Sequence, residues 1–458
     1  MRELEALAAR HLTAHTLMQR AGLAIARLAL AVAPHAQVIW IACGPGNNGG
    51  DGYEAAVHLK QWGKLPVVTA CGHIDSLPVD AAASRQSALE AGVVITVEPP
   101  NQYDLCIDAL FGIGRIREIS ILYGAWISQI NSKIAPVLSV DIPSGLHAET
   151  GACQATFVRA DYTLSLLVLK PGLFTASGRD ACGEIWFDAL GVAEPTRMCA
   201  ELNGTPPPTV RTHNTHKGSF GDVGVIGGAK GMSGAALLAA LAALHGGAGR
   251  VYLALLDTSI AKLDTSQPGI MFRNLNDLAY ESMVIVAGCG GGDSIAEHLE
   301  GIMERSTRLV LDADALNAIS RDLSLQRKLA CRSHLTTVLT PHPLEAARLM
   351  NMQSADVQAD RLAVAQAIAD RFTCTVVLKG SGTVIAAPGI TSRINPTGNA
   401  RLATAGTGDV LAGQIGARLA SGGNAFQCAC ESVYLHGEVA DQWRNPFTMT
   451  AKDLAINL

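Results

Sequence analysis

The chain has 458 residues, more than a single hydrophobic core usually organises, so two domains are expected. Its 46 glycines, 16% charged residues and 5% aromatic residues are typical of a compact α/β enzyme and argue against a disordered or fibrous protein. A net charge of −5 does not provide the positive surface that binds nucleic acid or an anionic membrane. Any phosphate must therefore be bound by local loops.

Cysteine usage and the first residues bear on the cellular compartment. The eleven cysteines are scattered without a Cys-x-x-Cys pair, so neither a disulfide framework nor a zinc site is indicated. The chain opens with Glu3 and Glu5 rather than with a basic segment, and its longest apolar helical run is interrupted by Arg27. We therefore expect a cytoplasmic protein with no targeting segment and no membrane partner.

The first half alternates helix-like and strand-like runs. A long helix is expected over residues 13–33. Strands are expected at 38–43, 66–70, 92–97, 103–108 and 136–140. This alternation implies right-handed crossovers and a parallel sheet that helices cover on both faces. Ligands of such sheets bind at the carboxyl ends of the strands, so the loops that follow the strands are the candidate binding segments.

The segment Gly44–Gly52 follows the first expected strand and holds five glycines in nine positions. We expect a loop that leads into a helix at Tyr53, because glycines let the backbone approach a phosphate and the amides of a first helical turn point at it. The segment matches neither the dinucleotide GxGxxG pattern nor a Walker A loop. An ordinary turn is the alternative, but Asn47, Asn48 and Asp51 favour a polar ligand.

Acidic residues also follow two later strands of the first half. Asp108 ends one strand and is followed by Gly112 and Gly114, and Asp141 ends the next and is followed by Ser144. Because the carboxyl ends of parallel strands meet at one edge of a sheet, we expect both loops to converge on the Gly44–Gly52 segment.

A proline-rich stretch at residues 203–208 is the clearest linker signal. We place the boundary near residue 205, which gives domains of 1–205 and 206–458. A second α/β system follows, and three helices are expected between residues 408 and 458. Its strands are expected at 222–226, 250–255, 283–287, 308–311, 336–339, 375–378 and 383–386.

In the second half, Gly406–Asp409 places two glycines and an aspartate at a helix start. Amides there can hold a transferring phosphoryl group, while Asp409 can accept the proton of an attacking hydroxyl. The alternative is that Asp409 only caps its helix. The loop Lys379–Thr383 offers a cation suited to adenine nucleotide phosphates, although such a sequence also resembles many surface turns.

Two further segments leave alternatives open. His342 stands between Pro341 and Pro343, which make its geometry rigid, but a lone histidine is more often structural. Asp312 and Asp314 follow an expected strand, and they suit metal or phosphate–metal contacts as well as they suit helix capping.

Together these motifs carry a resemblance to a known family. In the first half, Gly44–Gly52, Asp108–Gly114 and Asp141–Gly145 resemble the NAD(P)H-hydrate epimerase domain. In the second half, His216–Gly218, Asp312–Asn317, Thr340–Pro343, Lys379–Thr383 and Gly406–Asp409 resemble the ADP/ATP-dependent NAD(P)H-hydrate dehydratase. The resemblance implies a Rossmann-like parallel-sheet domain followed by a ribokinase-like α/β domain. It also implies repair of NADHX and NADPHX: the first domain would interconvert their R and S epimers, and the second would dehydrate the S form.

For the first domain, the resemblance implies that Asp141 contacts the hydrated ring and moves protons. It implies potassium ligands at Asn48, Asp108 and Ser144. The dinucleotide would be held by Asn47, Asn48, Gly49, Gly50 and Asp51. Its phosphates would be wrapped by Gly112, Ile113, Gly114, Arg115, Ile116, Arg117 and Glu118.

For the second domain, the resemblance implies that Asp409 removes the proton from the C6 hydroxyl. Phosphoryl oxygens would be stabilised by Gly406, Thr407 and Gly408. The AMP portion would be bound by Lys379, Gly380, Ser381, Gly382 and Thr383. The hydrate pocket would be lined by Ala235, Gly290 and His342. The resemblance further implies Mg²⁺ with ADP, which we favour over ATP, and a homo-oligomer.

This chain departs from the family pattern at several positions. Ile113 and Arg115 replace the family's usual Thr and Leu, and Cys289 stands where a proline is common. The alternative function is a ribokinase-like small-molecule kinase fused to a non-catalytic nucleotide-binding module. A kinase would release a stable phosphoester, whereas a dehydratase releases NAD(P)H and phosphate.

Overall fold

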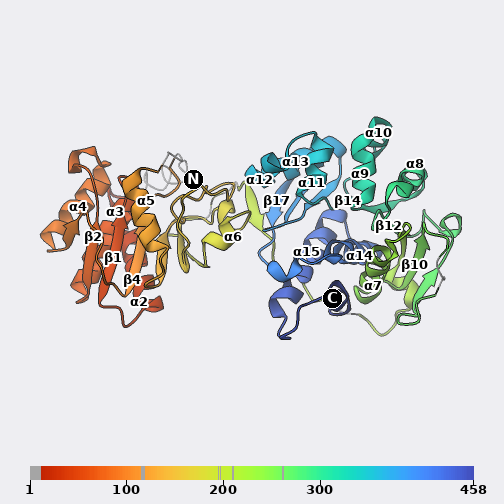
Figure 1. Cartoon of the computed structure of the whole chain (residues 1–458), viewed down its shortest axis with the longest axis horizontal. Helices are drawn as coiled ribbons and strands as arrows, with labels where there is room; N and C mark the ends of the chain where they lie inside the picture. The colour runs from red at the N-terminus through yellow and green to blue at the C-terminus, as the bar shows by residue number, and fades with distance from the viewer. Residues whose placement is uncertain (1–11, 115–118, 194, 196–197, 209–210, 260–262) are drawn as a thin grey trace. The chain divides into compact units, whose positions relative to one another are not determined.

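The computed structural model describes residues 12–458 except 115–118, 194, 196–197, 209–210 and 260–262. The chain forms two compact units, Met1–Met198 and Cys199–Leu458; in Figure 1 the colour runs continuously along the chain, from red at the N-terminus to blue at the C-terminus. The division precedes the predicted linker, because the strand β8 (Ala200–Leu202) pairs in parallel with β17 (Ile390–Ile394) of the second unit.

The first unit contains a seven-stranded sheet in the order β3-β2-β1-β4-β5-β6-β7, and every pairing is parallel. The strands are β1 (Val38–Cys43), β2 (Leu65–Thr69), β3 (Val94–Thr96), β4 (Leu105–Ala109), β5 (Val137–Val140), β6 (Tyr162–Leu166) and β7 (Glu184–Asp188). The predicted parallel sheet is confirmed, and it contains two strands, β6 and β7, that were not expected from the sequence.

Helices cover both faces of this sheet, as predicted. The helices are α2 (Thr16–Val32), α3 (Asn47–Gln61), α4 (Val79–Glu90), α5 (Ile121–Ile130) and α6 (Gly178–Ala181). Alternate strand residues divide between two cores: Ile39 and Ile41 pack with α2 and α3, whereas Trp40 packs on the other face with Trp126 of α5. This division follows from the two-residue side-chain period of a strand.

The helix α3 begins at Asn47, six residues earlier than the expected start at Tyr53. Asn, Gly and Asp are weak helix formers, which is why the sequence favoured a loop here. Tertiary packing overrides this preference, because the helix passes very close to its neighbours. A Cβ on Gly49 would lie 2.0 Å from the Gly44 carbonyl oxygen, and one on Gly52 would lie 2.7 Å from Ala109 Cβ.

The second unit contains a ten-stranded mixed sheet in the order β11-β10-β9-β12-β13-β14-β15-β16-β17-β8. Its strands other than β8 and β17 are β9 (Asp222–Gly227), β10 (Arg250–Leu255), β11 (Ile270–Phe272), β12 (Val284–Ala287), β13 (Arg308–Leu311), β14 (Thr337–Leu339), β15 (Thr375–Leu378) and β16 (Val384–Ala387). The pairs β15–β16 and β16–β17 are antiparallel, and the other pairs are parallel.

Helices cover both faces of the second sheet, and the three predicted C-terminal helices are confirmed (Figure 1). The helices are α7 (Ser233–His245), α8 (Ala296–Arg305), α9 (Asp314–Arg321), α10 (Leu323–Ala330), α11 (Pro343–Met350), α12 (Ser354–Ala359), α13 (Arg361–Phe372), α14 (Thr407–Ala420), α15 (Ala425–Gln442) and α16 (Ala451–Ile456). One core joins the sheet to α8, α9, α11 and α13, and the other joins it to α7, α14 and α15. Across the described residues, no helix has both the length and the apolar character needed to cross a membrane.

Candidate active sites

The glycine segment and the Asp108 loop meet where the strand order of the first sheet reverses. β1 lies between β2 and β4. The chain adds β2 and β3 on one side of β1, and then β4 to β7 on the other side. Ligands of open parallel sheets bind in such a crevice. The two loops touch there, since a Cβ on Gly44 would lie 1.7 Å from the Leu110 carbonyl oxygen.

The helix α3 presents its N-terminus at this crevice. Gly46 is the N-cap and makes no side-chain capping bond, so the first amides of the helix, from Asn47 onward, have no partner of that kind. Asn47 is exposed and Asp51 is half-buried, whereas Gly49 and Gly50 are buried. The residues predicted to form an anion-binding loop are therefore the first turn of a helix rather than a loop ahead of it.

Asp108 and Ser144, predicted to share a site, are in direct contact. Asp108 is completely buried, and its Oδ1 accepts a hydrogen bond from Ser144 Oγ at 2.6 Å. Its Oδ2 accepts from Ser144 N at 2.9 Å and from Ser139 Oγ at 2.8 Å. Burial raises the pKa of Asp108, and these hydrogen bonds oppose the shift. A buried carboxylate of this kind is stabilised by a nearby positive charge.

Asn48 lies next to the loop that follows Asp108. A Cβ on Gly112 would lie 3.3 Å from Asn48 Oδ1. Asn48 Nδ2 is buried and has no hydrogen-bond partner among the described residues. Because a half-turn of the side chain exchanges the two amide atoms, this position can equally present an oxygen. Oxygen donors from Asn48, Asp108 and Ser144 therefore fit a hard cation such as potassium.

The loop assigned to the phosphates is described only in part. Gly112 and Ile113 are half-buried and Gly114 is exposed. The predicted phosphate contacts Arg115, Ile116, Arg117 and Glu118 lie outside the described residues.

Asp141 is paired with a lysine that no sequence motif indicated. Asp141 follows β5 in a left-handed backbone conformation with φ of 68°. Its Oδ1 accepts a hydrogen bond from the ammonium of Lys170, which also donates to the Leu166 carbonyl oxygen at 2.7 Å. Both charged side chains are buried. The ion pair fixes the orientation of the carboxylate.

The second unit has a crevice of the same kind, because β9 lies between β10 and β12. The loops that follow β9 and β12 touch: Gly228 N donates to the Cys289 carbonyl oxygen at 3.0 Å. Ala235 and Gly290, both assigned to the hydrate pocket, are also brought together. A Cβ on Gly290 would lie 2.9 Å from Ala235 Cβ.

Asp409 lies in the first turn of α14, beside this crevice. The N-cap of α14 is Gly406, with φ of 92°, so Asp409 is not itself the capping residue. Burial raises the pKa of Asp409 to about 6, and the charge of Asp312 adds to the shift. A carboxylate with a pKa near neutrality at the positive end of a helix is suited to take a proton beside a bound phosphate.

Lys379 connects the predicted nucleotide loop to Asp409. Its Nζ lies 2.6 Å from Asp312 Oδ1, and a Cβ on Gly408 would lie 3.2 Å from the same nitrogen. Burial alone would lower the pKa of Lys379, but Asp312 and Glu345 outweigh burial and raise it. The structure thus brings together Lys379, Gly408 and Asp409, which the sequence placed in one site.

A buried arginine, also missed from the sequence, supports the loop behind Lys379. The guanidinium of Arg361 donates to the carbonyl oxygens of Leu378 and Lys379, each at 3.1 Å. Gly380 has φ of 131°, and a Cβ there would lie 3.0 Å from this guanidinium. The other loop residues range from exposed to buried, and they are Ser381, Gly382 and Thr383.

His342 is the N-cap of α11. Its Nδ1 accepts a hydrogen bond from Leu344 N at 3.0 Å, so the proton of the neutral ring is on Nε2, 3.2 Å from Glu345 Oε1. Burial and the charge of Lys379 lower the pKa of His342. The imidazole is therefore neutral near pH 7, with a structural capping role on one nitrogen.

Asp312 and Asp314 have different surroundings. Asp312 is buried and accepts hydrogen bonds from Lys379 and from Thr340 Oγ1 at 2.7 Å. Asp314 begins α9, and its Oδ2 accepts from Gly292 N at 2.8 Å. Asp314 therefore stabilises a helix start and the β12 loop, whereas Asp312 belongs to the polar cluster around Lys379.

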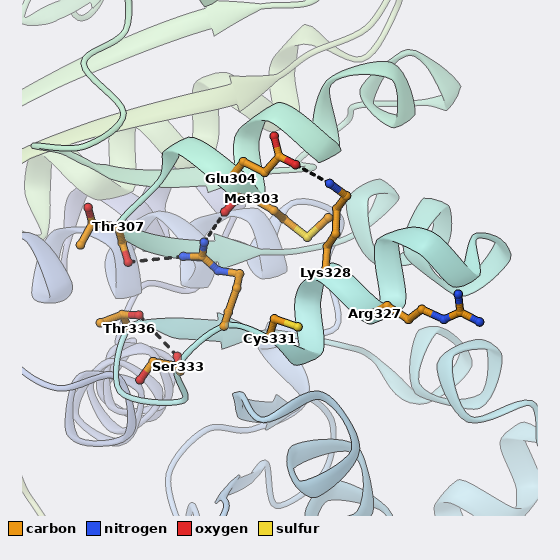
Figure 2. A pocket seen from close by; sticks show the side chains of 9 residues that line it. Met303, Glu304, Thr307, Arg327, Lys328, Cys331, Ser333 and Thr336 are labelled. Atoms are coloured by element: carbon orange, nitrogen blue, oxygen red, sulfur yellow. Dashed lines mark hydrogen bonds and ion pairs between the residues drawn. The ribbon is translucent and has the colours of Figure 1, made fainter.

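A separate cavity of about 540 Å³ lies at the amino-terminal ends of strands in the second sheet (Figure 2). It is lined by Thr307 and Thr336, which precede β13 and β14, whereas the Asp409 crevice follows the strands. The Arg332 guanidinium beside it is bonded to the carbonyl oxygens of Met303 and Thr307. This cavity is not part of the candidate active site.

Comparison with known proteins links these two crevices to one family. A family model described as NAD(P)H-hydrate dehydratase matches residues 223–457, and one described as YjeF-related protein N-terminus matches residues 14–172. A bifunctional NAD(P)H-hydrate repair enzyme from Escherichia coli K12 is 37% identical, over 96% of this chain and 87% of its own. The chain belongs to this family of bifunctional NAD(P)H-hydrate repair enzymes. The predicted pairing of an epimerase with an ADP- or ATP-dependent dehydratase is thereby confirmed.

Other repair enzymes and two solved structures are also similar. The enzyme from Coxiella burnetii is 34% identical, over 96% of this chain and 93% of its own. A dehydratase from Bacillus subtilis, crystallised with ATP and Mg²⁺, is 28% identical, covers 57% of this chain and 96% of its own, and has a TM-score of 0.47. A ribokinase-like protein from Enterococcus faecalis is 25% identical, covers 54% of this chain and 89% of its own, and has a TM-score of 0.48.

Proposed function

We propose that the Asn48–Asp141 crevice interconverts the R and S hydrates of NADH and NADPH, and that the Asp409 crevice dehydrates the S hydrate. ADP would be the phosphoryl donor and would leave as AMP. The observation that carries this function is the 37% identity to a bifunctional NAD(P)H-hydrate repair enzyme over 96% of the chain. The two polar crevices at the carboxyl ends of the two sheets support it.

In the first crevice, the amides of the first turn of α3 bind a phosphate of the dinucleotide. Asp141, held by Lys170, contacts the hydrated ring and moves the proton of its C6 hydroxyl while a bond at C6 opens and closes again from the other face. Asn48, Asp108 and Ser144 would hold potassium, whose charge would stabilise Asp108 and the bound phosphates.

In the second crevice, Asp409 takes the proton of the C6 hydroxyl as the oxygen attacks the terminal phosphorus of ADP. The amides of Gly406 to Gly408 stabilise the transferring oxygens. The ring nitrogen then expels phosphate from C6, and loss of the C5 proton restores the double bond. Mg²⁺ would accompany ADP and neutralise charge on its phosphates.

Lys379 to Thr383 would bind the AMP portion, and Ala235, Gly290 and His342 would line the hydrate pocket. The contacts of Lys379 with Asp312 and of Gly290 with Ala235 support these assignments. A homo-oligomer and a cytoplasmic location are further predictions, tested by analytical ultracentrifugation and by cell fractionation.

The decisive experiment supplies a mixture of R and S NADH hydrates with Mg²⁺, K⁺ and either ADP or ATP. Full recovery of NADH absorbance with one phosphate per NADH is expected, faster with ADP than with ATP. Hydrates that stay inert with either nucleotide would overturn the proposal. A phosphorylated hydrate or other stable phosphoester would instead support the small-molecule kinase.

A further inference from the structure

Cys289 lies against the Asp409 crevice of the second unit. The flanking residues Gly288 and Gly290 both have left-handed backbone conformations, with φ of 116° and 60°. This tight turn packs against β9, as the hydrogen bond from Gly228 N to the Cys289 carbonyl shows. The Cys289 side chain is completely buried and its position is fixed by the turn.

Two carboxylates face this sulfur. The ligand atoms of Cys289, Asp312 and Asp409 all lie within 4.8 Å of one another. The Cys289 Sγ is 3.9 Å from Asp312 Oδ2. With Zn–S near 2.3 Å and Zn–O near 2.1 Å, two ligand atoms of a tetrahedral zinc lie about 3.6 Å apart. The 3.9 Å between the Cys289 sulfur and Asp312 Oδ2 is close to this spacing, and the remaining pairs lie within 4.8 Å.

The hydrogen bonds that Asp312 accepts from Lys379 and Thr340 leave its Oδ2 available to a metal. Its Oδ1 accepts hydrogen bonds from Lys379 Nζ at 2.6 Å and Thr340 Oγ1 at 2.7 Å. Its Oδ2 faces the sulfur instead. Second-shell bonds of this kind orient a ligating carboxylate and hold it in place.

We propose that Cys289, Asp312 and Asp409 form a binding site for a thiophilic divalent cation such as Zn²⁺. The cysteine releases its proton to solvent when the sulfur binds the metal. Asp409 is half-buried and gives access from solvent, and the three protein ligands leave a fourth position open. A metal held there occupies the oxygen that would accept the substrate proton, so it inhibits dehydration. That consequence rests on the proposed function, whereas binding does not.

The test titrates the whole protein with Co²⁺ as a spectroscopic substitute for Zn²⁺, without nucleotide or hydrate. One equivalent is expected to give a thiolate-to-cobalt charge-transfer band, which added Zn²⁺ removes. The Cys289→Ser and Cys289→Pro variants should lose the band and bind at least about 10-fold more weakly, since even an outer-shell partner contributes that much. Cys331→Ser, which removes an exposed thiol of the same unit, is the matched control and should keep the band.

Absence of the band in the parent protein, or its persistence in both Cys289 variants, would overturn the site. In a separate arm, Zn²⁺ should inhibit dehydration by the parent more strongly than dehydration by Cys289→Pro, each relative to its own metal-free rate. Equal inhibition of the two proteins would show that zinc acts elsewhere. Because the cobalt arm contains no substrate, it distinguishes failure of the site from failure of the proposed function.

Discussion

Asp409 combines burial with a position at a helix N-terminus, and this combination sets the pH at which it can act. Burial and the charge of Asp312 raise its pKa to about 6. A general base works in its deprotonated form, so the rate of dehydration should increase as pH rises through about 6 and should fall below it. We expect kcat/KM for the S hydrate to follow this single ionisation between pH 5 and 8. A profile without an inflection in that range would contradict the assignment.

Lys170 is the residue whose loss should most affect the first site. Lys170→Met leaves the buried Asp141 carboxylate without its ammonium partner, which should destabilise the first unit by about 3–5 kcal/mol and slow epimerisation. Urea unfolding and chromatographic measurement of R to S exchange test these effects. Lys133→Met is the control, because its pair with Asp161 is partly exposed and should contribute at most about 1 kcal/mol. Equal stability losses in the two variants would contradict the prediction.

Single residues were predictable where their chemistry was carried by a motif. Asp108 and Ser144 were expected together, and their side chains are 2.6 Å apart. Lys170 was missed because its partner Asp141 lies 29 residues away and no pattern joins them. Arg361 was missed for a related reason, since a lone arginine in an amphipathic helix normally indicates a solvent-facing position, whereas this one is completely buried.

At the scale of elements, α14 carries Asp409 and depends on close packing against α7. A Cβ on Gly413 of α14 would lie 2.0 Å from the Ala239 carbonyl oxygen of α7. Gly413→Ala should therefore destabilise the second unit by about 1–3 kcal/mol. It should also lower the urea midpoint at which dehydratase activity is lost.

Gly301→Ala in α8 is the matched control, because a Cβ there meets nothing within 4 Å. Removing a helical glycine without a clash should stabilise the unit by about 0.5–1 kcal/mol. If Gly413→Ala were as stable as Gly301→Ala, the close contact between α14 and α7 would not exist in solution.

Elements were predictable from the sequence where their hydrophobic period was clear. Most strands of both sheets were expected within a few residues. β7 was not, because it is an edge strand with three of its five residues exposed and carries little periodic signal. The start of α3 was placed too late, because glycines that disfavour a helix in isolation are here what allows it to pack.

At the scale of the whole molecule, the two units have separate cores, and each contains one of the two proposed catalytic carboxylates. Asp409→Ala should abolish NADH formation, with a loss of about 10²- to 10⁴-fold, while R to S exchange continues. Chromatography of the two epimers together with NADH absorbance measures both reactions in one sample. NADH still formed at the parental rate would contradict the role of Asp409.

Asp141→Ala should give the opposite result. The S hydrate is consumed at the parental rate, and the R hydrate then declines only as fast as it epimerises spontaneously. Equally rapid loss of both epimers would show that Asp141 is not needed for exchange.

The short strand β8 has a consequence for how the two activities can be separated. The prolines at residues 206–208 look like the natural place to cut the chain, but β8 lies before them and pairs with β17. A fragment that starts at residue 206 would leave the backbone groups on one edge of β17 without their β8 partners. Such an edge can pair with another copy of the fragment and cause aggregation. A fragment that starts at Cys199 keeps this edge covered. The segment that joins the two enzymes is thus already part of the second one.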